Sequence, residues 1–290
     1  MNLGYIDYLN CYPLYYHMFE NEPLPDVRIH PGYPSVLNRM MGTGELDLSP
    51  ISAASYANLE ESVVLLPDFC ISSNGYVQSV ILASRLPIEE LDGKTVGLSR
   101  ASHTSEVLLK VLMRKYYAIE PVYVPADPNP WLTGQGIDAA LIIGNDAMLQ
   151  KPAEHVYDLG SLWLEKTGHP VVFAVFAVRE SAVSNSLKAV EAIVHSYTRS
   201  LFCLESERQR LIQKARGKYP LIKSDIDAYY RVLQYSFTDI RKEALVFYLL
   251  SAGELGLIRK VGGLKLLDLP QRATEDGMHI SLKNNGALRK

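Results

Sequence analysis

Short apolar runs and amphipathic segments alternate along most of the chain. The runs rich in Val, Ile, Leu and Tyr are typical of β-strands. They occupy residues 2–9, 45–51, 62–68, 76–84, 91–99, 121–125, 136–143 and 171–178. Apolar side chains instead recur at helical spacing in residues 35–41 and 102–117, and almost throughout 184–258. Strands that alternate with helices predict an α/β fold with largely parallel sheets.

The order of these elements predicts two lobes joined by two crossing strands. A central strand–helix cycle is bracketed by two long apolar strands, and the helices after it have no sheet of their own. The predicted division is residues 1–83 plus 175–264 for lobe 1, 84–174 for lobe 2 and 265–290 for a polar, loosely held tail. We expect the crossings near Ile81–Ser84 and Phe176–Arg179, with a ligand cleft between the lobes.

Composition and charge exclude several classes of protein. Lys and Arg total 29 against 32 Asp and Glu, a net charge of −3, which offers no basic surface for nucleic acid. No apolar run reaches membrane-spanning length, and no export signal opens the chain. The cysteines, Cys11, Cys70 and Cys203, form no CxxC pair. We therefore expect a cytoplasmic protein without metal or cofactor. Whether it forms a homo-oligomer stays open.

Small polar residues follow the predicted strands, and these positions are where α/β folds bind ligands. Hydroxyls, amides and glycines there supply hydrogen bonds or let backbone N–H groups approach a ligand. The hydroxyl-rich start of the helix at 102 also suits a carboxylate or phosphate. The candidates are Asn10, Ser52, Ser79, Ser102, His103, Thr104, Ser105, Asn145 and Gly168.

Each candidate has a simpler explanation in the fold. Ser102 or Thr104 would suit a helix N-cap, and Asn10 or Asn145 would suit a turn. Ser79 lies inside an apolar strand, where its hydroxyl needs either a ligand or a neighbouring strand. His103 could act as a base or lie in solvent at the helix start. Cys11 lacks a neighbouring base in the sequence, which disfavours a nucleophilic role.

Six segments in order resemble the chorismate dehydratases of the futalosine route to menaquinone. They are GYIDYLNCYPLYY, GELDLSPISAASYA, LLPDFCISSNGYVQSVILAS, LSRASHTSEVLLKVLM, DAALIIGNDAM and WLEKTGHPVVFAVFAVR, within residues 2–180. The resemblance implies a type II periplasmic-binding-protein-like fold and a cytoplasmic hydro-lyase. The implied reaction removes water from chorismate to give 3-[(1-carboxyvinyl)oxy]benzoate. Dihydroxynaphthoate synthase of the same route opens with an SPCPNDT-type motif, whereas this chain has YLNCYP.

The resemblance extends most closely to Asn10 and Ser79, which it implies to be catalytic, and the other candidates would bind chorismate. No strong base follows the predicted strands, so we favour proton removal by chorismate's own enolpyruvyl carboxylate, with His103 as the alternative. The rival hypotheses are a non-enzymatic carboxylate-binding protein of the same fold, a ligand-sensing regulatory domain, and a related lyase or synthase for another cyclic carboxylate.

Overall fold

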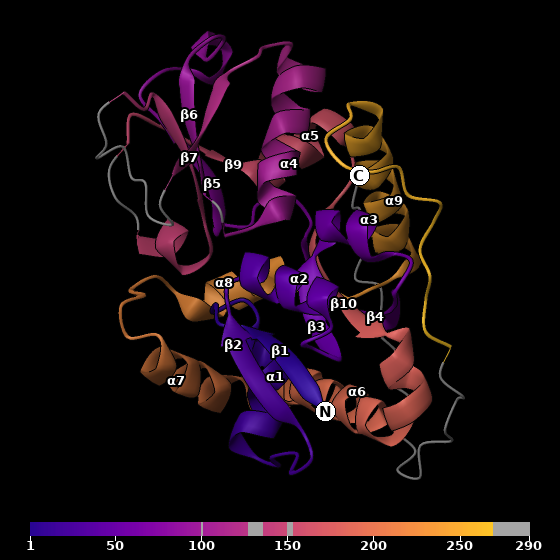
Figure 1. Cartoon of the computed structure of the whole chain (residues 1–290). Helices are drawn as coiled ribbons and strands as arrows, with labels where there is room; N and C mark the ends of the chain where they lie inside the picture. The colour runs from indigo at the N-terminus through magenta and orange to yellow at the C-terminus, as the bar shows by residue number, and fades with distance from the viewer. Residues whose placement is uncertain (100, 127–135, 150–152, 269–290) are drawn as a thin grey trace, which may run out of the picture.

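The computed structural model describes residues 1–99, 101–126, 136–149 and 153–268, and it contains two β-sheets with helices on their faces (Figure 1). The strands of the first sheet are β1 (Asn2–Ile6), β2 (Arg28–Gly32), β3 (Leu48–Ser52), β4 (Val63–Ser73), β10 (Val171–Arg179) and β11 (Leu233–Ser236). Those of the second are β5 (Val80–Ser84), β6 (Thr95–Ser99), β7 (Val122–Ala126), β8 (Ala139–Ile143) and β9 (His155–Asp158). Their spatial orders are β11-β4-β10-β3-β1-β2 and β7-β6-β8-β5-β9.

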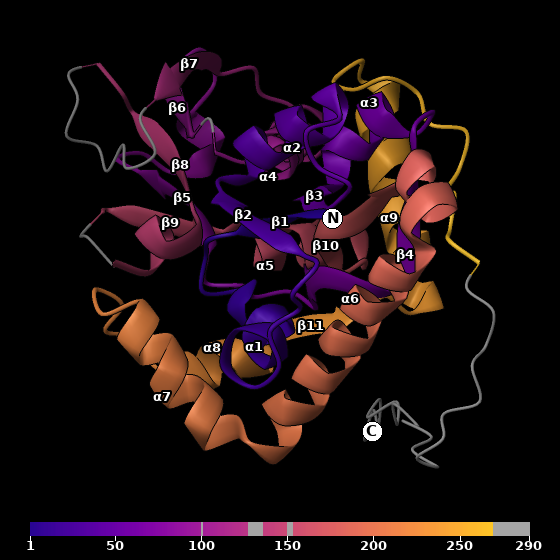
Figure 2. The same ribbon diagram turned by 60° about the horizontal axis from the view of Figure 1, so that its bottom comes forward.

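Helices cover both sheets, as two views of the molecule show (Figures 1 and 2). They are α1 (Tyr12–Glu20), α2 (Pro34–Thr43), α3 (Tyr56–Leu59), α4 (His103–Val111), α5 (Leu159–Thr167), α6 (Glu180–Ser206), α7 (Arg208–Lys218), α8 (Ile226–Val232) and α9 (Asp239–Glu254). Short 3-10 turns occupy Ala53–Ser55, Ile88–Glu90 and Gly144–Leu149, and a π-helical turn, Leu112–Tyr117, extends α4.

The chain changes sheets outside the strands that were expected to cross. β5 lies wholly in the second sheet and β10 wholly in the first. The crossings therefore fall between Ser73 and Val80 and between Thr167 and Val171, so their predicted positions near Ile81–Ser84 and Phe176–Arg179 were wrong. β5 and β10 each pair with neighbouring strands of one sheet over nearly their whole length. The chain therefore passes from one sheet to the other in the loop that precedes each of these strands. The lobe boundaries stay a prediction.

The sheets are mixed, so the expectation of largely parallel pairing was also wrong. β1 pairs in parallel with β2 and β3, but β10 runs antiparallel to both β3 and β4. In the second sheet β5 runs antiparallel to β8 and β9. The antiparallel pairs involve the strands next to the crossings, where the chain leaves one sheet and returns to it in the opposite direction.

The C-terminal region is not entirely helical. β11 forms an edge strand antiparallel to β4, and its burial alternates, with Leu233 and Tyr235 inside. Four residues are too few for a period of two to stand out from a helical pattern. The sequence also missed β2 and β9, which are similarly short, and the nine-residue helix α5.

The beginning of the expected tail is held by the first sheet. The Leu65 N–H donates to the Lys265 carbonyl, and the Leu267 N–H donates to the Leu65 carbonyl, both at 2.8 Å. Leu267 is buried. The expectation of a loosely held tail was therefore wrong for residues 265–267, because backbone hydrogen bonds to β4 hold them. Residues 269–290 lie outside the described part of the chain.

One hydrophobic core includes residues of both sheets, and α9 contributes to joining them. Its Phe247 and Tyr248 rings contact Trp163 of α5, with centroids 5.9 and 5.8 Å apart. The Tyr248 hydroxyl donates to the Thr104 carbonyl of α4 at 3.0 Å, while α9 also packs on β10. Figure 1 shows α9 beside α4 and α5. The last helix of the described chain thus packs against β10 of the first sheet and against the helices α4 and α5.

Candidate ligand cavity

A small cavity of about 40 Å³ lies where residues from the two sheets meet. Its walls are formed by Ile6, Tyr8, Asn10, Pro34, Ser52, Ile71, Val77, Ser79, Val80, Ser102, Ser105, Ile143, Gly144, Phe173, Ala174 and Leu233. Pockets for small molecules usually measure at least about 300 Å³. In the described conformation the cavity is therefore smaller than the pockets that usually hold small molecules.

The first loop places Asn10 at this cavity. β1 ends at Ile6, and α1 begins after the N-cap Cys11, with a proline in its first turn. Pro13 suits that turn because its missing N–H would have no helical partner there. The Leu9 N–H donates to Asn145 Oδ1 at 2.9 Å, which ties the loop to the turn after β8 in the second sheet.

Three polar atoms at the cavity wall are buried and have no hydrogen-bond partner within the described protein. They are Tyr8 Oη, Asn10 Oδ1 and Ser52 Oγ. A buried polar atom without a partner costs roughly 1–3 kcal/mol. Native proteins retain few such groups, and bound water, a bound ion or a catalytic role is a common reason. Three of the unpartnered buried polar atoms thus belong to residues of one cavity wall.

Tyr8 lies against Gly144, whose backbone has φ +62°. A Cβ built on Gly144 would lie 2.6 Å from the Tyr8 ring, so only glycine allows this approach. Burial raises the pKa of the Tyr8 phenol well above its usual value, and Asp146 and Tyr33 add to the rise. Tyr8 is consequently a neutral hydrogen-bond donor at physiological pH.

Ser79 is buried in the crossing segment before β5, and its oxygen accepts a hydrogen bond from the Tyr229 hydroxyl at 2.8 Å. Its carbonyl accepts the Gly144 N–H at 2.7 Å. The partner of the Ser79 hydroxyl is therefore a tyrosine of helix α8, not the neighbouring strand that was expected, and Ser79 also lines the cavity.

The start of α4 contributes two hydroxyls to the wall. Ser102 is the N-cap of α4 and accepts the Ser105 N–H at 3.4 Å, while the Ser105 hydroxyl donates to Ser102 Oγ at 3.2 Å. Both residues line the cavity. The N-cap explanation of Ser102 is confirmed, and it does not remove Ser102 from the candidate site.

Thr104 and His103 point elsewhere. The Thr104 hydroxyl donates to the Phe173 carbonyl at 2.9 Å and accepts the Ala54 N–H at 3.2 Å. Its proton and its oxygen thus both have hydrogen-bond partners within the protein. His103 Nδ1 lies 3.0 Å from Ser55 Oγ. Burial lowers the pKa of the His103 imidazole. Neither residue is among those that line the cavity.

Asn145 and Gly168 also lie outside the wall. Asn145 uses its amide oxygen to hold the Leu9 N–H, and so it supports the Asn10 loop. Gly168 is the exposed C-cap of α5 with φ +73°, a left-handed position that glycine adopts without strain. The structure thus brings Asn10, Ser52, Ser79, Ser102 and Ser105 together.

The wall formed by described residues contains no Asp, Glu, His, Lys or Arg. Across the described ranges, no cluster of His, Cys, Asp and Glu has the arrangement of a metal site. All the cysteines are free thiols and buried. The described part of the wall therefore consists of neutral polar and apolar side chains.

Sequence reasoning missed Tyr229, Phe173 and Leu233, and it assigned most N-terminal tyrosines to packing. The signal for Tyr229 was an aromatic cluster, AYYRVLQYSF, at residues 228–237. Nothing in that cluster shows which distant residues it contacts, because Tyr229 and Ser79 are 150 positions apart.

The fold belongs to the periplasmic-binding-protein-like class. A protein of Archaeoglobus fulgidus superposes with a TM-score of 0.71 at 21% identity, over 89% of this chain and 98% of that one. The periplasmic aliphatic sulphonate binding protein SsuA from Escherichia coli has a TM-score of 0.63 at 16% identity, over 99% and 98%. None of the helices in the described ranges combines the length and hydropathy of a membrane span.

Residues 1–254 match a family model described as menaquinone biosynthesis, and the chain belongs to that family. A chorismate dehydratase of Thermus thermophilus is 32% identical over 61% of this chain and 69% of its own length. A second, from Campylobacter jejuni, is 28% identical over 61% and 67%. A 1,4-dihydroxy-6-naphtoate synthase of Thermus thermophilus is 26% identical over 67% and 71%. The resemblance seen in the sequence is confirmed.

Proposed function

We propose that this protein is a chorismate dehydratase, a hydro-lyase that acts in the cytoplasm on the route to menaquinone. Family membership and the relatives of that name support the proposal. The structural observation that carries it is the set of unpartnered polar atoms, Tyr8 Oη, Asn10 Oδ1 and Ser52 Oγ, in a small cavity whose described wall residues carry no charge.

The proposed reaction is an elimination that makes the ring aromatic. Chorismate loses its 4-hydroxyl as hydroxide and one ring proton from the carbon that bears the enol ether. The electron pair of that C–H bond becomes part of the new aromatic ring, and the proton and hydroxide together form water. Because the product is strongly favoured, the protein needs mainly to hold one conformer and to stabilise the departing hydroxide.

The cavity residues suit these tasks without carrying charge. The Asn10 amide can donate to the departing hydroxyl and accept from another substrate group. Hydroxyls of Ser79 and Ser102 can donate to the substrate carboxylates, and the N-terminus of α4 favours a negative charge. The Ser105 hydroxyl donates to Ser102 Oγ, so it leaves the Ser102 proton available for the substrate. A carboxylate in the wall would instead repel a dianion.

The neutral wall favours proton removal by the substrate itself. No described wall residue is a carboxylate or a histidine, so the enolpyruvyl carboxylate of chorismate is the base that remains. His103 is the alternative, but it faces Ser55 and does not line the cavity. Closure around the substrate would exclude water and hold that carboxylate near the ring hydrogen.

Purified protein treated with a chelator is expected to convert chorismate to 3-[(1-carboxyvinyl)oxy]benzoate. The reason is that the elimination requires positioning and hydrogen bonding, which the cavity residues supply. Product identity is measured by mass spectrometry and by the ultraviolet spectrum of the aromatic ring. Turnover that returns only after addition of a divalent ion would contradict the mechanism. Binding of chorismate without product would favour the carboxylate-binding protein instead.

Replacing Ser79 with alanine is expected to lower kcat/KM for chorismate by about 10- to 100-fold. One charge-assisted hydrogen bond to a carboxylate contributes roughly 1.5–3 kcal/mol. The change also leaves the buried Tyr229 hydroxyl without its acceptor, so stability falls by about 1–3 kcal/mol. Steady-state kinetics and urea unfolding measure the two effects. An unchanged kcat/KM would leave Ser79 with only a structural role.

A further inference from the structure

One segment after α7, residues 226–236, contributes a phenol to each of the two residues proposed as catalytic. The Tyr229 hydroxyl donates to Ser79 Oγ at 2.8 Å. Both residues are 1% exposed, so bulk water does not compete for this bond. Burial raises the pKa of the Tyr229 phenol, which keeps it protonated and able to donate.

The same segment holds the Asn10 loop by its backbone. The Tyr230 hydroxyl donates to the Leu9 carbonyl at 3.2 Å, and the Tyr235 hydroxyl donates to the Asn10 carbonyl at 2.9 Å. Both tyrosines are buried. These hydrogen bonds use only backbone carbonyl oxygens, so the side-chain amide of Asn10 remains available to face the cavity.

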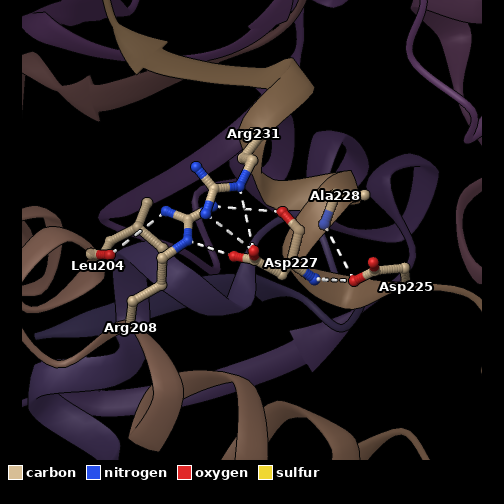
Figure 3. A network of polar contacts seen from close by, with 6 residues as sticks. All are labelled: Leu204, Arg208, Asp225, Asp227, Ala228 and Arg231. Atoms are coloured by element: carbon tan, nitrogen blue, oxygen red, sulfur yellow. Dashed lines mark hydrogen bonds and ion pairs between the residues drawn. The ribbon is translucent and has the colours of Figure 1, made fainter.

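A polar network fixes α8, the helix that carries Tyr229 (Figure 3). Its N-cap Asp225 accepts the N–H groups of Asp227 and Ala228 at 2.9 and 3.1 Å. The Asp227 carboxylate accepts hydrogen bonds from Arg231 on α8 and from Arg208 at the start of α7. The Arg208 guanidinium lowers the pKa of Asp227, so this ion pair persists at neutral pH. The orientation of Tyr229 is therefore set by its own helix and α7.

We infer that Tyr229 is a positioning residue that makes Ser79 a hydrogen-bond donor toward the substrate. A serine hydroxyl has one proton and two acceptor lone pairs. Because Tyr229 donates to the Ser79 oxygen, the Ser79 proton must point in another direction. Among the described residues no acceptor for that proton is present, and Ser79 lines the cavity. The proton is thus directed into the cavity, toward a carboxylate. This inference rests on the proposed function.

A double-mutant cycle tests whether Tyr229 acts through Ser79. The variants are Tyr229→Phe, Ser79→Ala and the two combined, each assayed for kcat/KM with chorismate and for the Kd of the aromatic product. Tyr229→Phe removes only the hydroxyl, which lets the Ser79 proton rotate toward other directions. We expect a loss of roughly 5- to 30-fold in kcat/KM and a parallel rise in product Kd. In the Ser79→Ala background the same change is expected to have almost no effect.

Tyr197→Phe is the matched control. Its hydroxyl is also buried and donates to the Tyr15 hydroxyl at 2.7 Å, but Tyr15, unlike Ser79, does not line the cavity. Its kcat/KM is expected to equal that of the parent protein. The inference would be overturned if the losses in kcat/KM from Tyr229→Phe and Ser79→Ala multiply in the double variant. It would also be overturned if Tyr229→Phe has the same kcat/KM as the parent protein. If the parent protein itself fails to convert chorismate, the proposed function is wrong, and the inference is rejected with it.

Discussion

Replacing Asn10 by aspartate is expected to reduce kcat for chorismate by about 100- to 1,000-fold, which is the usual cost of losing a preorganised donor at a departing oxygen. Aspartate has nearly the same shape, so packing around the loop is retained. The change replaces the amide's donor with a carboxylate oxygen in a cavity whose described walls offer no compensating positive side chain. A dianionic substrate is then repelled, and hydroxide loses its hydrogen bond. Single-turnover kinetics separates this chemical effect from substrate binding.

Asn10→Leu distinguishes repulsion from loss of the donor. It removes the amide without adding charge, so activity equal to that of Asn10→Asp would indicate that the donor is the important feature. Because Asn10 Oδ1 is buried without a partner, Asn10→Leu is also expected to keep or raise the free energy of unfolding, by about 1 kcal/mol. Parent-level turnover in both variants would mean that Asn10 is only a turn residue and that the site lies elsewhere.

Gly144→Ala is expected to destabilise the protein by about 2–5 kcal/mol and to impair turnover as well. A left-handed φ of +62° costs a side chain roughly 1–2 kcal/mol, and the new Cβ would meet the Tyr8 ring at 2.6 Å, which adds about 1–3 kcal/mol. Relief of that overlap requires Tyr8 to move within the cavity wall. Urea unfolding and steady-state kinetics measure the two consequences.

Gly93→Ala provides the control for backbone strain alone. Gly93 has φ +66°, and a Cβ there would meet no atom within 4 Å. It should lose roughly 1–2 kcal/mol of stability and keep parent kcat/KM, since it shares the strain of Gly144 without the overlap. Equal effects from the two substitutions would contradict a role for the contact between Tyr8 and Gly144.

The sequence by itself determined the elements whose pattern is long and regular. The helix predicted at 35–41 and the strand at 171–178 appear as α2 and β10, because amphipathic or apolar periodicity over many residues reflects burial directly. The turn residues after β1 and β8 were also recognisable. Asn10 lines the cavity, while Asn145 lies outside its wall and holds the Leu9 N–H. Local chemistry was sufficient for these features.

The tertiary structure alone decided which polar groups face the cavity. Ser102, His103, Thr104 and Ser105 are consecutive and all polar, yet only the two serines line the wall, since the turn of a helix sends neighbouring side chains in different directions. Ser79 as a donor depends on Tyr229, 150 residues away. Such pairings arise from the packing of distant segments. A hydroxyl-rich stretch of sequence does not show which hydroxyl proton is available to a ligand and which is already donated to another protein group.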